Sequence, residues 1–516
     1  MTKNELDITQ FFWLILIGFV VALVARRFKV PYALALVVTG VIIGASPFLP
    51  QARLEPSLLF RVFLPPLLFE ATINLRLEAL KRDWKPITIY TLGGTLISTF
   101  VVGAIVSVVL GIPFKVAFVF GALISATDPI AVIGIFKRLG AGKRLTLIVE
   151  AESLFNDGVA VVLFAVALEI VAGRNVSLQG SLLQFLRLMM GGIALGAGIG
   201  WLAARVHDGL DDHLVEITLT SIVAFGSYLG AEALHVSGVM AVVSAGLVIG
   251  NYGMQSSMTP GTRLAVTAFW EYAGFVVNSL IFLLIGIEAT YVHWNDKWLI
   301  VLVANVAVLV GRAAIYPLSW VVNRIKGDVP SAWQHILFWG GLRGALSLAL
   351  ALGLSRDFPL REMWIASTAG VVMFSLLGQG ITLSPLLDHL QKTETPKADP
   401  EGKGRLMSEV VAIRAALLEL ERAKAQEVYP TWAFTLLLRR YQERLEQAEA
   451  ALRTINPGAE TPSIVVTTQL RESLFLAEKS AYQEAERSGW LSAEDWQKIA
   501  QRIDLELIAL SSEKRE

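Results

Sequence analysis

Four acidic side chains lie in stretches of sequence that are otherwise apolar. Asp128 belongs to the octapeptide SATDPIAV, and Glu150, Glu152 and Asp157 belong to the segment VEAESLFNDGVAVVLF. One ionised carboxylate at the centre of a bilayer costs about 2.5–3.5 kcal/mol on insertion scales, so four unpaired acids would cost on the order of 10 kcal/mol. If these stretches lie in a membrane, the chain must pair the acids, hydrate them or use them in proton or cation chemistry.

The second segment places its polar side chains on neighbouring helical faces. Glu152 and Asn156 are four residues apart and share one face, and Ser153 and Asp157 share the adjacent face. Asp157 has only Asn156 and Ser153 as polar neighbours on its own helix. We therefore expect Asp157 to be the acid that stays free to change protonation, whereas Glu150 stands nearer the end of the segment.

Two arginines in other apolar segments can supply a counter-charge for Glu152. Arg312 lies in LVGRAAIYPL and Arg343 lies in GGLRGALSLAL. Either guanidinium could pair with the Glu152 carboxylate, and a buried pair of this kind serves architecture more often than chemistry. The residues alone leave the choice of arginine open.

Pro129 predicts a break in the helix that carries Asp128. Proline has no N–H group and disfavours helical geometry in the preceding residue, so we expect unwound backbone at Thr127 and Asp128. Unwound backbone at membrane depth persists only where protein or water covers it. Asp128 can neutralise the positive half-helix end, and Arg343 can do the reverse for carbonyl ends. The alternative is a proline kink with a capping aspartate and no further role.

A further acid, Glu70, follows a proline pair in the segment LPPLLFEATINL. Its position is compatible with a residue on an ion pathway and equally with an acid near a helix end. Other classes of site receive no support. The chain has no cysteine, no HExxH motif and no complete phosphate-binding loop, so no cofactor is expected. The formal net charge of zero gives no indication of nucleic-acid binding.

The composition is that of a membrane protein with a soluble tail. Of the 516 residues, 54% are hydrophobic and 17% are charged, whereas soluble domains contain about 25% charged residues. Residues 1–400 contain 53 charged side chains, and the 116 residues of 401–516 contain 35. A helix needs roughly 20 mainly apolar residues to cross a bilayer. Thirteen segments are candidates: 8–27, 31–49, 57–77, 86–111, 114–138, 143–172, 181–206, 211–231, 236–250, 263–289, 297–323, 332–353 and 362–388.

Basic residues are unevenly divided between the two sides of these predicted spans. The loops after odd-numbered spans contain 15 Lys and Arg residues, and the opposite side contains 7. Because basic residues near helix ends stay in the cytoplasm, we expect a cell-membrane protein with its N-terminus outside and its C-terminus in the cytoplasm.

Three regions follow one another along the chain. Residues 1–390 form the predicted transmembrane domain, and a polar linker with prolines and glycines follows at 391–405. Apolar residues then recur at three- and four-residue spacing, which predicts a cytoplasmic helical domain over 406–516. Its role is open between regulation, dimer contact and a plain solvated domain.

The order of the spans indicates an internal duplication. Six helices, one linking helix and six further helices would place the second copy upside down, an arrangement common in transporters. The fifth span of the first set contains the Asp128–Pro129 break, and the corresponding span, 332–353, has glycines around Arg343. The predicted fold is an all-α polytopic membrane protein with two inverted six-helix repeats, each with a broken helix, and a C-terminal helical domain.

The motifs SATDPIAV, ESLFNDGVAVVLF, LPPLLFEA and GGLRGALSLAL together resemble one known family, the monovalent cation:proton antiporters. Within that family they are similar to the sodium/proton exchangers of the NhaP and NHE type. The resemblance covers roughly residues 8–390 and shows no departure at these motifs. It implies thirteen transmembrane helices in inverted repeats, crossed broken helices, a homodimer and no cofactor beyond the transported ion.

The resemblance also implies a role for each polar residue. Asp157, beside Asn156, would bind the cation and the proton. Glu152 and Arg312 would form a structural ion pair, and Arg343 would balance the crossed helix ends. An Asn-Asp pair is associated in the family with electroneutral one-for-one exchange. The remaining members of the cation shell would be Asp128, the backbone near Thr127, Ser153 and Glu70.

The chemistry of these residues fits the implied activity. Hard monovalent cations prefer oxygen ligands, which carboxylates, hydroxyls and unwound carbonyls supply. A carboxylate that holds either a proton or the cation, and crosses only when occupied, makes exchange obligatory as one bundle rocks against the other. Sodium is the expected substrate, with lithium or potassium as alternatives that the ligand types cannot separate. Rivals of another class are a cation channel with a carboxylate filter and an intramembrane hydrolase with paired aspartates.

Overall fold

The chain forms two compact units, residues 1–394 and 395–516. The computed structural model describes residues 8–28, 31–46, 56–139, 141–173, 177–206, 212–254, 258–292, 294, 297–325, 329–393, 410, 413–414, 416–417, 420 and 431–455. Every regular element within these residues is a helix, as the apolar composition predicts.

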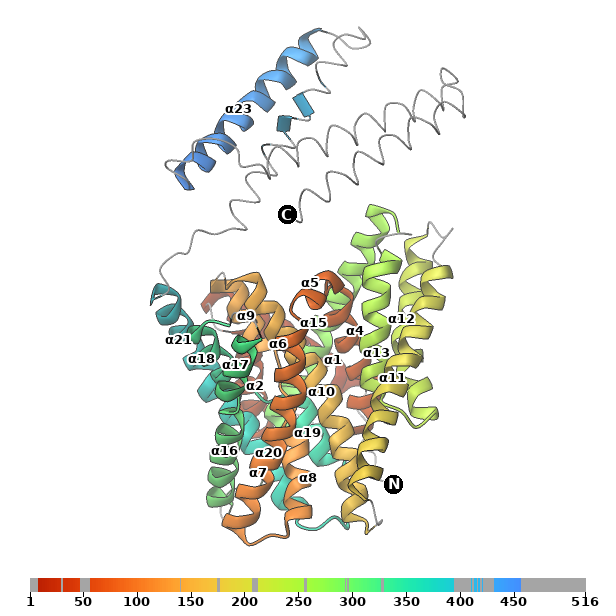
Figure 1. The fold of residues 1–516 in the computed structure, drawn as a ribbon, viewed down its shortest axis with the longest axis vertical. Helices are drawn as coiled ribbons and strands as arrows, with labels where there is room; N and C mark the ends of the chain where they lie inside the picture. The colour runs from red at the N-terminus through yellow and green to blue at the C-terminus, as the bar shows by residue number, and fades with distance from the viewer. Residues whose placement is uncertain are drawn as a thin grey trace. The chain divides into compact units, whose positions relative to one another are not determined.

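The first unit is built from long membrane-length helices (Figure 1). Within the described residues, nine helices are long and apolar enough to cross a bilayer. Their bounds are α1 (Ile8–Phe28), α3 to α4 through η1 (Pro56–Ile73), α6 to α7 through η2 (Trp84–Leu110), α10 (Lys143–Val171), α11 (Leu178–Val206), α12 (His213–Ala233), α15 (Pro260–Thr290), α16 (Trp298–Arg312) with α17 (Ile315–Arg324), and α20 (Arg361–Met373) to α21 (Gly380–Thr393) through η4.

Four of the thirteen predicted spans are shorter or interrupted. They correspond to α2 (Tyr32–Gly44), α8 (Phe114–Ile124) with α9 (Ile130–Leu139), α13 (Gly238–Val248) with η3, and α18 (Ser331–Trp339) with α19 (Ala345–Leu352). Each predicted range overlaps one helix or one interrupted pair. The count of thirteen spans nevertheless stays a prediction, because length and composition alone identify nine among the residues that the structure describes.

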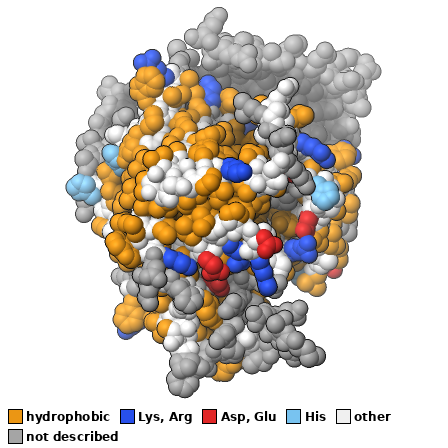
Figure 2. Space-filling view, turned by 90° about the horizontal axis from the view of Figure 1, so that it is seen from below, with side chains coloured by type: hydrophobic (Ala, Val, Ile, Leu, Met, Phe, Trp, Pro, Cys, Tyr) orange, Lys and Arg blue, Asp and Glu red, His pale blue; other side chains and the backbone are white. Residues whose placement is uncertain are grey.

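Large apolar side chains cover much of the surface of the first unit. Phe12, Phe19, Leu183 and Ile222, on α1, α11 and α12, are all more than half exposed. Hydrophobic side chains are also the commonest kind on the described part of the face in Figure 2. Soluble monomers rarely expose apolar patches of this extent, whereas lipid solvates them. The first unit is therefore a multi-pass membrane domain.

Two helices are broken and cross at their breaks. Residues 125–129 separate α8 from α9, and residues 340–344 separate α18 from α19. The two pairs run in opposite directions (Figure 1). The N–H of Asp128 donates to the carbonyl oxygen of Leu342 at 2.8 Å, which joins the two unwound segments directly. The break predicted from Pro129 is thus matched by a second break around Arg343.

Glycines bring the backbones of α2 and α15 into contact. A Cβ atom at Gly40 would lie 2.2 Å from the carbonyl oxygen of Leu283, and a Cβ at Gly286 would lie 2.2 Å from that of Val37. Small residues are the means by which membrane helices approach closely, because apolar side chains gain nothing by leaving lipid. This contact fixes α2 against the C-terminal third of α15.

In the second unit the structure describes α23 (Thr431–Ile455) and a few residues before it. Val410, Ile413 and Ala448 form a small apolar cluster, and Arg414 pairs with Glu449 at 2.8 Å. This helix lies within the helical domain predicted over 406–516. Residues 394–405 of the predicted linker lie outside the described residues, so the domain boundaries stay predictions.

Substituting Gly40 by alanine is expected to lower the thermal stability of the membrane unit. The added methyl group must push α2 away from α15, and overpacking of this kind costs about 1–3 kcal/mol. Gly226→Ala in α12 is the matched control, because a Cβ there would meet no atom within 4 Å, and alanine favours helix over glycine. Melting of the two variants in detergent tests this, and equal melting temperatures would contradict the packing argument.

Candidate functional site

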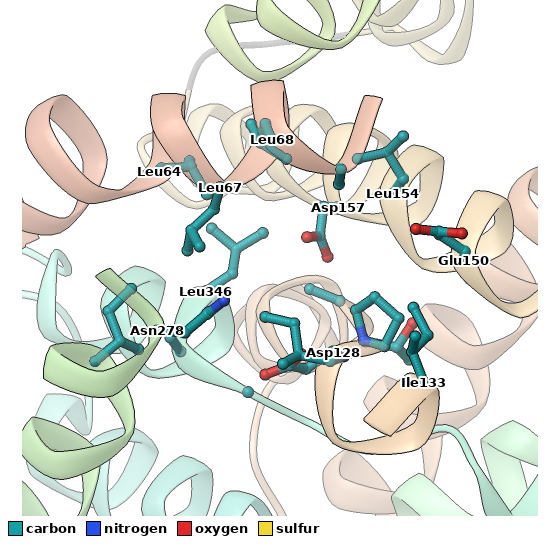
Figure 3. Close-up of a pocket in the computed structure, with 18 of the residues that line it drawn as sticks. Leu64, Leu67, Leu68, Asp128, Ile133, Glu150, Leu154, Asp157, Asn278 and Leu346 are labelled. Carbon is teal, nitrogen blue, oxygen red and sulfur yellow. Dashed lines mark hydrogen bonds between the residues drawn. The ribbon is translucent and has the colours of Figure 1, made fainter. Parts of the chain in front are cut away.

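A cavity of about 300 Å³ brings most of the predicted acids together (Figure 3). Asp157 and Glu150 reach it from α10, Glu70 from α4 (Leu64–Ile73), and Asp128 from the break between α8 and α9. The Asp157 carboxylate points into the cavity, and Asp128 lies across from it. The Oδ1 atom of Asp157 is buried and accepts no hydrogen bond from the described residues. Asp157 is thus an acid with unused ligand capacity that faces the cavity.

Asn156 holds the unwound segment beside Asp157. Its amide nitrogen donates to the carbonyl oxygen of Ser125 at 3.1 Å and to Thr127 Oγ1 at 3.2 Å. Its amide oxygen accepts from Thr95 Oγ1 at 2.8 Å. Thr127 Oγ1 in turn lies 2.8 Å from Ser153 Oγ. Both ends of the Asn156 amide therefore have protein partners, and the side chain links α10 to the break.

Asp128 serves the positive ends of both broken helices. Its Oδ1 accepts from the N–H of Ile130 at 2.9 Å, in the first turn of α9. Its other carboxylate oxygen would lie 2.5 Å from a Cβ at Gly344, so only glycine fits where α19 begins. The N-terminus of a helix carries about half a positive charge. One carboxylate placed at two such ends balances them both.

Arginines occupy the two carbonyl ends. Arg343 is 1% exposed, and its Nη1 donates to the carbonyl oxygens of Ser125 at 2.6 Å and Ala126 at 3.2 Å, where α8 ends. Arg312 donates from Nε and Nη2 to the carbonyl oxygen of Leu337, in the last turn of α18, at 3.2 and 2.8 Å. Each guanidinium therefore places positive charge at the negative end of a half-helix.

Glu152 pairs with Arg312, which answers the choice that the residues alone left open. The two carboxylate oxygens accept from Nη1 and Nη2 at 2.5 and 3.0 Å, a bidentate arrangement. Glu152 is 2% exposed. The Glu152 carboxylate balances the part of the Arg312 charge that the carbonyl end of α18 leaves unbalanced. Neither residue lines the cavity, so we assign the pair a structural role.

Lining residues outside the predicted set complete the cavity. Lys137 of α9, whose side chain is exposed, lines it together with Glu70 and Glu150, so the cavity extends from the buried Asp157 to the surface near the end of α9. Asn278 of α15 lines this cavity and a neighbouring one of about 460 Å³. A lone amide in the apolar run VVNSLIFLLIG was a usable signal for Asn278. Thr95 gave none beyond a hydroxyl in a membrane helix.

Proteins named as sodium/proton antiporters are similar to this chain over most of its length. A family model described as "Sodium/hydrogen exchanger, transmembrane" matches residues 14–389. The chain is 36% identical to a Na(+)/H(+) antiporter NhaG of Bacillus atrophaeus over 426 residues, 80% of this chain and 80% of that protein. It is 37% identical over 473 residues to the Na(+)/H(+) antiporter ApNhaP of Aphanothece halophytica, covering 90% and 89%.

A solved structure supports the fold. The structure of the sodium proton antiporter MjNhaP1 from Methanocaldococcus jannaschii at pH 8 superposes with a TM-score of 0.61 at 20% identity, covering 74% of this chain and 98% of that one. The predicted all-α polytopic fold with crossed broken helices is confirmed by this likeness together with the helices described above.

Removing one partner of the Glu152–Arg312 pair is expected to destabilise the protein more than removing both. Arg312→Met leaves a buried carboxylate without a counter-charge, and single truncation of a buried pair costs about 3–5 kcal/mol. The double variant Glu152→Leu/Arg312→Met leaves no unpaired charge and should recover part of the loss, since only the α18 end stays uncapped.

The control for this prediction is Arg61→Met. Arg61 pairs with Glu232 at 2.7 Å in the same unit, but both side chains are largely exposed (59% and 45%), and exposed pairs contribute about 0–1 kcal/mol. Melting temperature and folded yield in detergent distinguish the variants. A single Arg312 variant as stable as Arg61→Met would show that the buried pair is dispensable.

Proposed function

Since the chain belongs to the sodium/hydrogen exchanger family, we propose that it exchanges sodium ions for protons across the cell membrane. The relatives NhaG and ApNhaP are named Na(+)/H(+) antiporters. The observation that carries the proposal is the Asp157 carboxylate, which lines the cavity with an oxygen that no described residue occupies. Asp157 would bind either a proton or a sodium ion, never both.

The oxygens around the cavity suit a small hard cation. Asp157 supplies the charge, and the break supplies oxygens that an intact helix would keep in its own hydrogen bonds. Ser153 and Thr127 lie one hydrogen bond apart beside it. Glu70 lines the same cavity nearer its mouth. Asp157, Asp128, Ser153 and the backbone near Thr127 would form the occupied site, and Glu70 would meet the ion on its way.

One free acid supports an exchange of one ion for one. The Asn156 amide carries no charge, and its nitrogen and oxygen both have protein partners. Asp128 is balanced by the ends of α9 and α19. Asp157 is then the group whose charge each cargo ion neutralises, so the loaded site has the same net charge with sodium as with a proton. Exchange would be electroneutral.

Alternating access requires the two walls of the cavity to move. Asp128, Asp157 and Ser347 lie on α9, α10 and α19, or at their ends, and Glu70 and Asn278 lie on α4 and α15. Rocking of the first wall against the second would carry the site from one side of the membrane to the other. Empty, Asp157 would be a bare charge facing apolar surroundings, which disfavours movement without cargo.

The topology and assembly are inferred as well. The excess of basic residues in loops after odd-numbered spans supports an external N-terminus and a cytoplasmic C-terminus. In that orientation the cavity, whose exposed end is marked by Lys137, opens to the cytoplasm. A homodimer is implied by family resemblance, and cross-linking of the purified protein in lipid would test it.

Asp157→Asn is expected to abolish sodium-driven proton movement, because an amide carries no charge that sodium and a proton can neutralise in turn. The measurement uses proteoliposomes loaded with a pH dye and challenged with lithium, sodium, potassium and rubidium in turn. Glu362→Gln, at a side chain that is 78% exposed, is the control and should exchange like the wild type. Preserved exchange in Asp157→Asn would refute the assignment, and ion flux without counter-moving protons would indicate a channel.

A further inference from the structure

Thr95 lies behind the site and does not line the cavity. It is 2% exposed and is the first residue of α7 (Thr95–Leu110), directly after the π-helical turn η2 (Ile89–Gly94). Its single hydroxyl hydrogen is shared between two acceptors, the Asn156 amide oxygen at 2.8 Å and the carbonyl oxygen of Thr91 in the preceding turn. The bond to Asn156 crosses from one membrane helix to another.

The Asn156 amide has one orientation that satisfies its surroundings. The Ser125 carbonyl oxygen has no hydrogen, so the group 3.1 Å from it must be the amide nitrogen. The amide oxygen must then face Thr95, which is the hydroxyl that can donate to it. Without that hydroxyl the oxygen is buried with no donor, and a rotated amide becomes competitive although it sets oxygen against the Ser125 carbonyl.

A fixed amide orders the hydroxyls next to it. The Asn156 nitrogen donates to Thr127 Oγ1 at 3.2 Å, which leaves the hydrogen of Thr127 available for Ser153 Oγ at 2.8 Å. Hydrogen bonds thus connect Thr95 through Asn156 and Thr127 to Ser153, a proposed sodium ligand, and in the last of them either hydroxyl can donate. The Asn156 amide also holds the Ser125–Thr127 backbone against α10.

The neighbouring hydroxyls of the same segment take no part in this chain of bonds. Thr91 Oγ1, Ser98 Oγ and Thr99 Oγ1 are buried and make no hydrogen bond with the described residues. Thr95, directly after η2, faces Asn156 of α10, while Thr99, one turn on, is equally buried and makes no such bond.

We propose that Thr95 is a positioning residue for sodium binding, acting through Asn156 on the broken helix. The inference rests on the exchange proposed above and adds a residue from a helix outside the cavity. Loss of the Thr95 hydroxyl should weaken sodium binding while Asp157 can still be protonated, so the sodium concentration for half-maximal exchange rises more than the maximal rate falls.

The test compares isosteric variants in proteoliposomes. Thr95→Val removes the hydroxyl and should raise the half-maximal sodium concentration roughly tenfold or more, in keeping with an unsatisfied buried acceptor. Thr95→Ser keeps the hydroxyl and should stay within about twofold of the wild type, for the same reason. Thr99→Val, a buried hydroxyl without a partner in the described residues, is the matched control and should leave the value unchanged.

Two further measurements separate positioning from plain stability. Adding Asn156→Ala to Thr95→Val should raise the half-maximal concentration little beyond Asn156→Ala alone, because residues acting through one another are not additive. Thr95→Val should melt somewhat below Thr99→Val, because it leaves the Asn156 amide oxygen without a donor, so exchange is compared at a temperature well below both melting transitions. If Thr95→Val does not fold, Thr95→Ala, which removes the hydroxyl without adding a branch, replaces it in the same comparison.

The possible outcomes point in different directions. A Thr95→Val half-maximal sodium concentration equal to that of the wild type, or one matched by Thr99→Val, would overturn the inference. Independent, additive effects of Thr95→Val and Asn156→Ala would overturn it also. If the wild-type protein moved no protons when sodium is added, the proposed function itself would be refuted.

Discussion

Two helices that break inside the same membrane domain impose the constraint on which the site depends. Each break leaves N–H groups and carbonyl groups without helical partners, and lipid offers neither donors nor acceptors. The protein answers with three charged side chains: Arg343 and Arg312 at the carbonyl ends of α8 and α18, and Asp128 at the N–H ends of α9 and α19. Glu152 then balances Arg312. Most of the buried charge in this region thereby serves architecture.

Asp157 differs from Asp128 and Glu152 in having a buried carboxylate oxygen without a hydrogen-bond donor among the described residues. In the sequence Asp128 and Glu152 are acids in apolar segments, as Asp157 is, and in the structure each has partners that use its charge. Asp157 has Asn156 beside it, an amide engaged at both ends, and keeps a buried oxygen that accepts no hydrogen bond from the described residues. A single acid of this kind in a low-dielectric site requires a neutralising partner. In an exchanger that partner is the cargo.

Local chemistry decided which features could be predicted from the sequence. Pro129 and the glycines around Arg343 predicted the two helix breaks, because proline and glycine change the backbone conformation locally. The partner of Glu152 could not be chosen, since Arg312 and Arg343 are both distant in sequence and only tertiary packing selects between them. Thr95 was missed for a related reason. A hydroxyl in a membrane helix is ordinary, and hydrophobic periodicity does not show which neighbouring helix it faces. The lone amide of Asn278 was a usable signal that the prediction did not take up.

The position of Asp128 has a mechanical consequence. The Asp128 carboxylate accepts a hydrogen bond at the start of α9 and lies against Gly344 at the start of α19, while the Asp128 N–H donates to the carbonyl oxygen of Leu342. If either half-helix moved away from the other, a partial positive charge at a helix N-terminus would lose the Asp128 carboxylate as its counter-charge, at a membrane depth where little water could replace it. The crossing therefore resists shear within itself. It is suited to move as one rigid body between the two sides of the membrane.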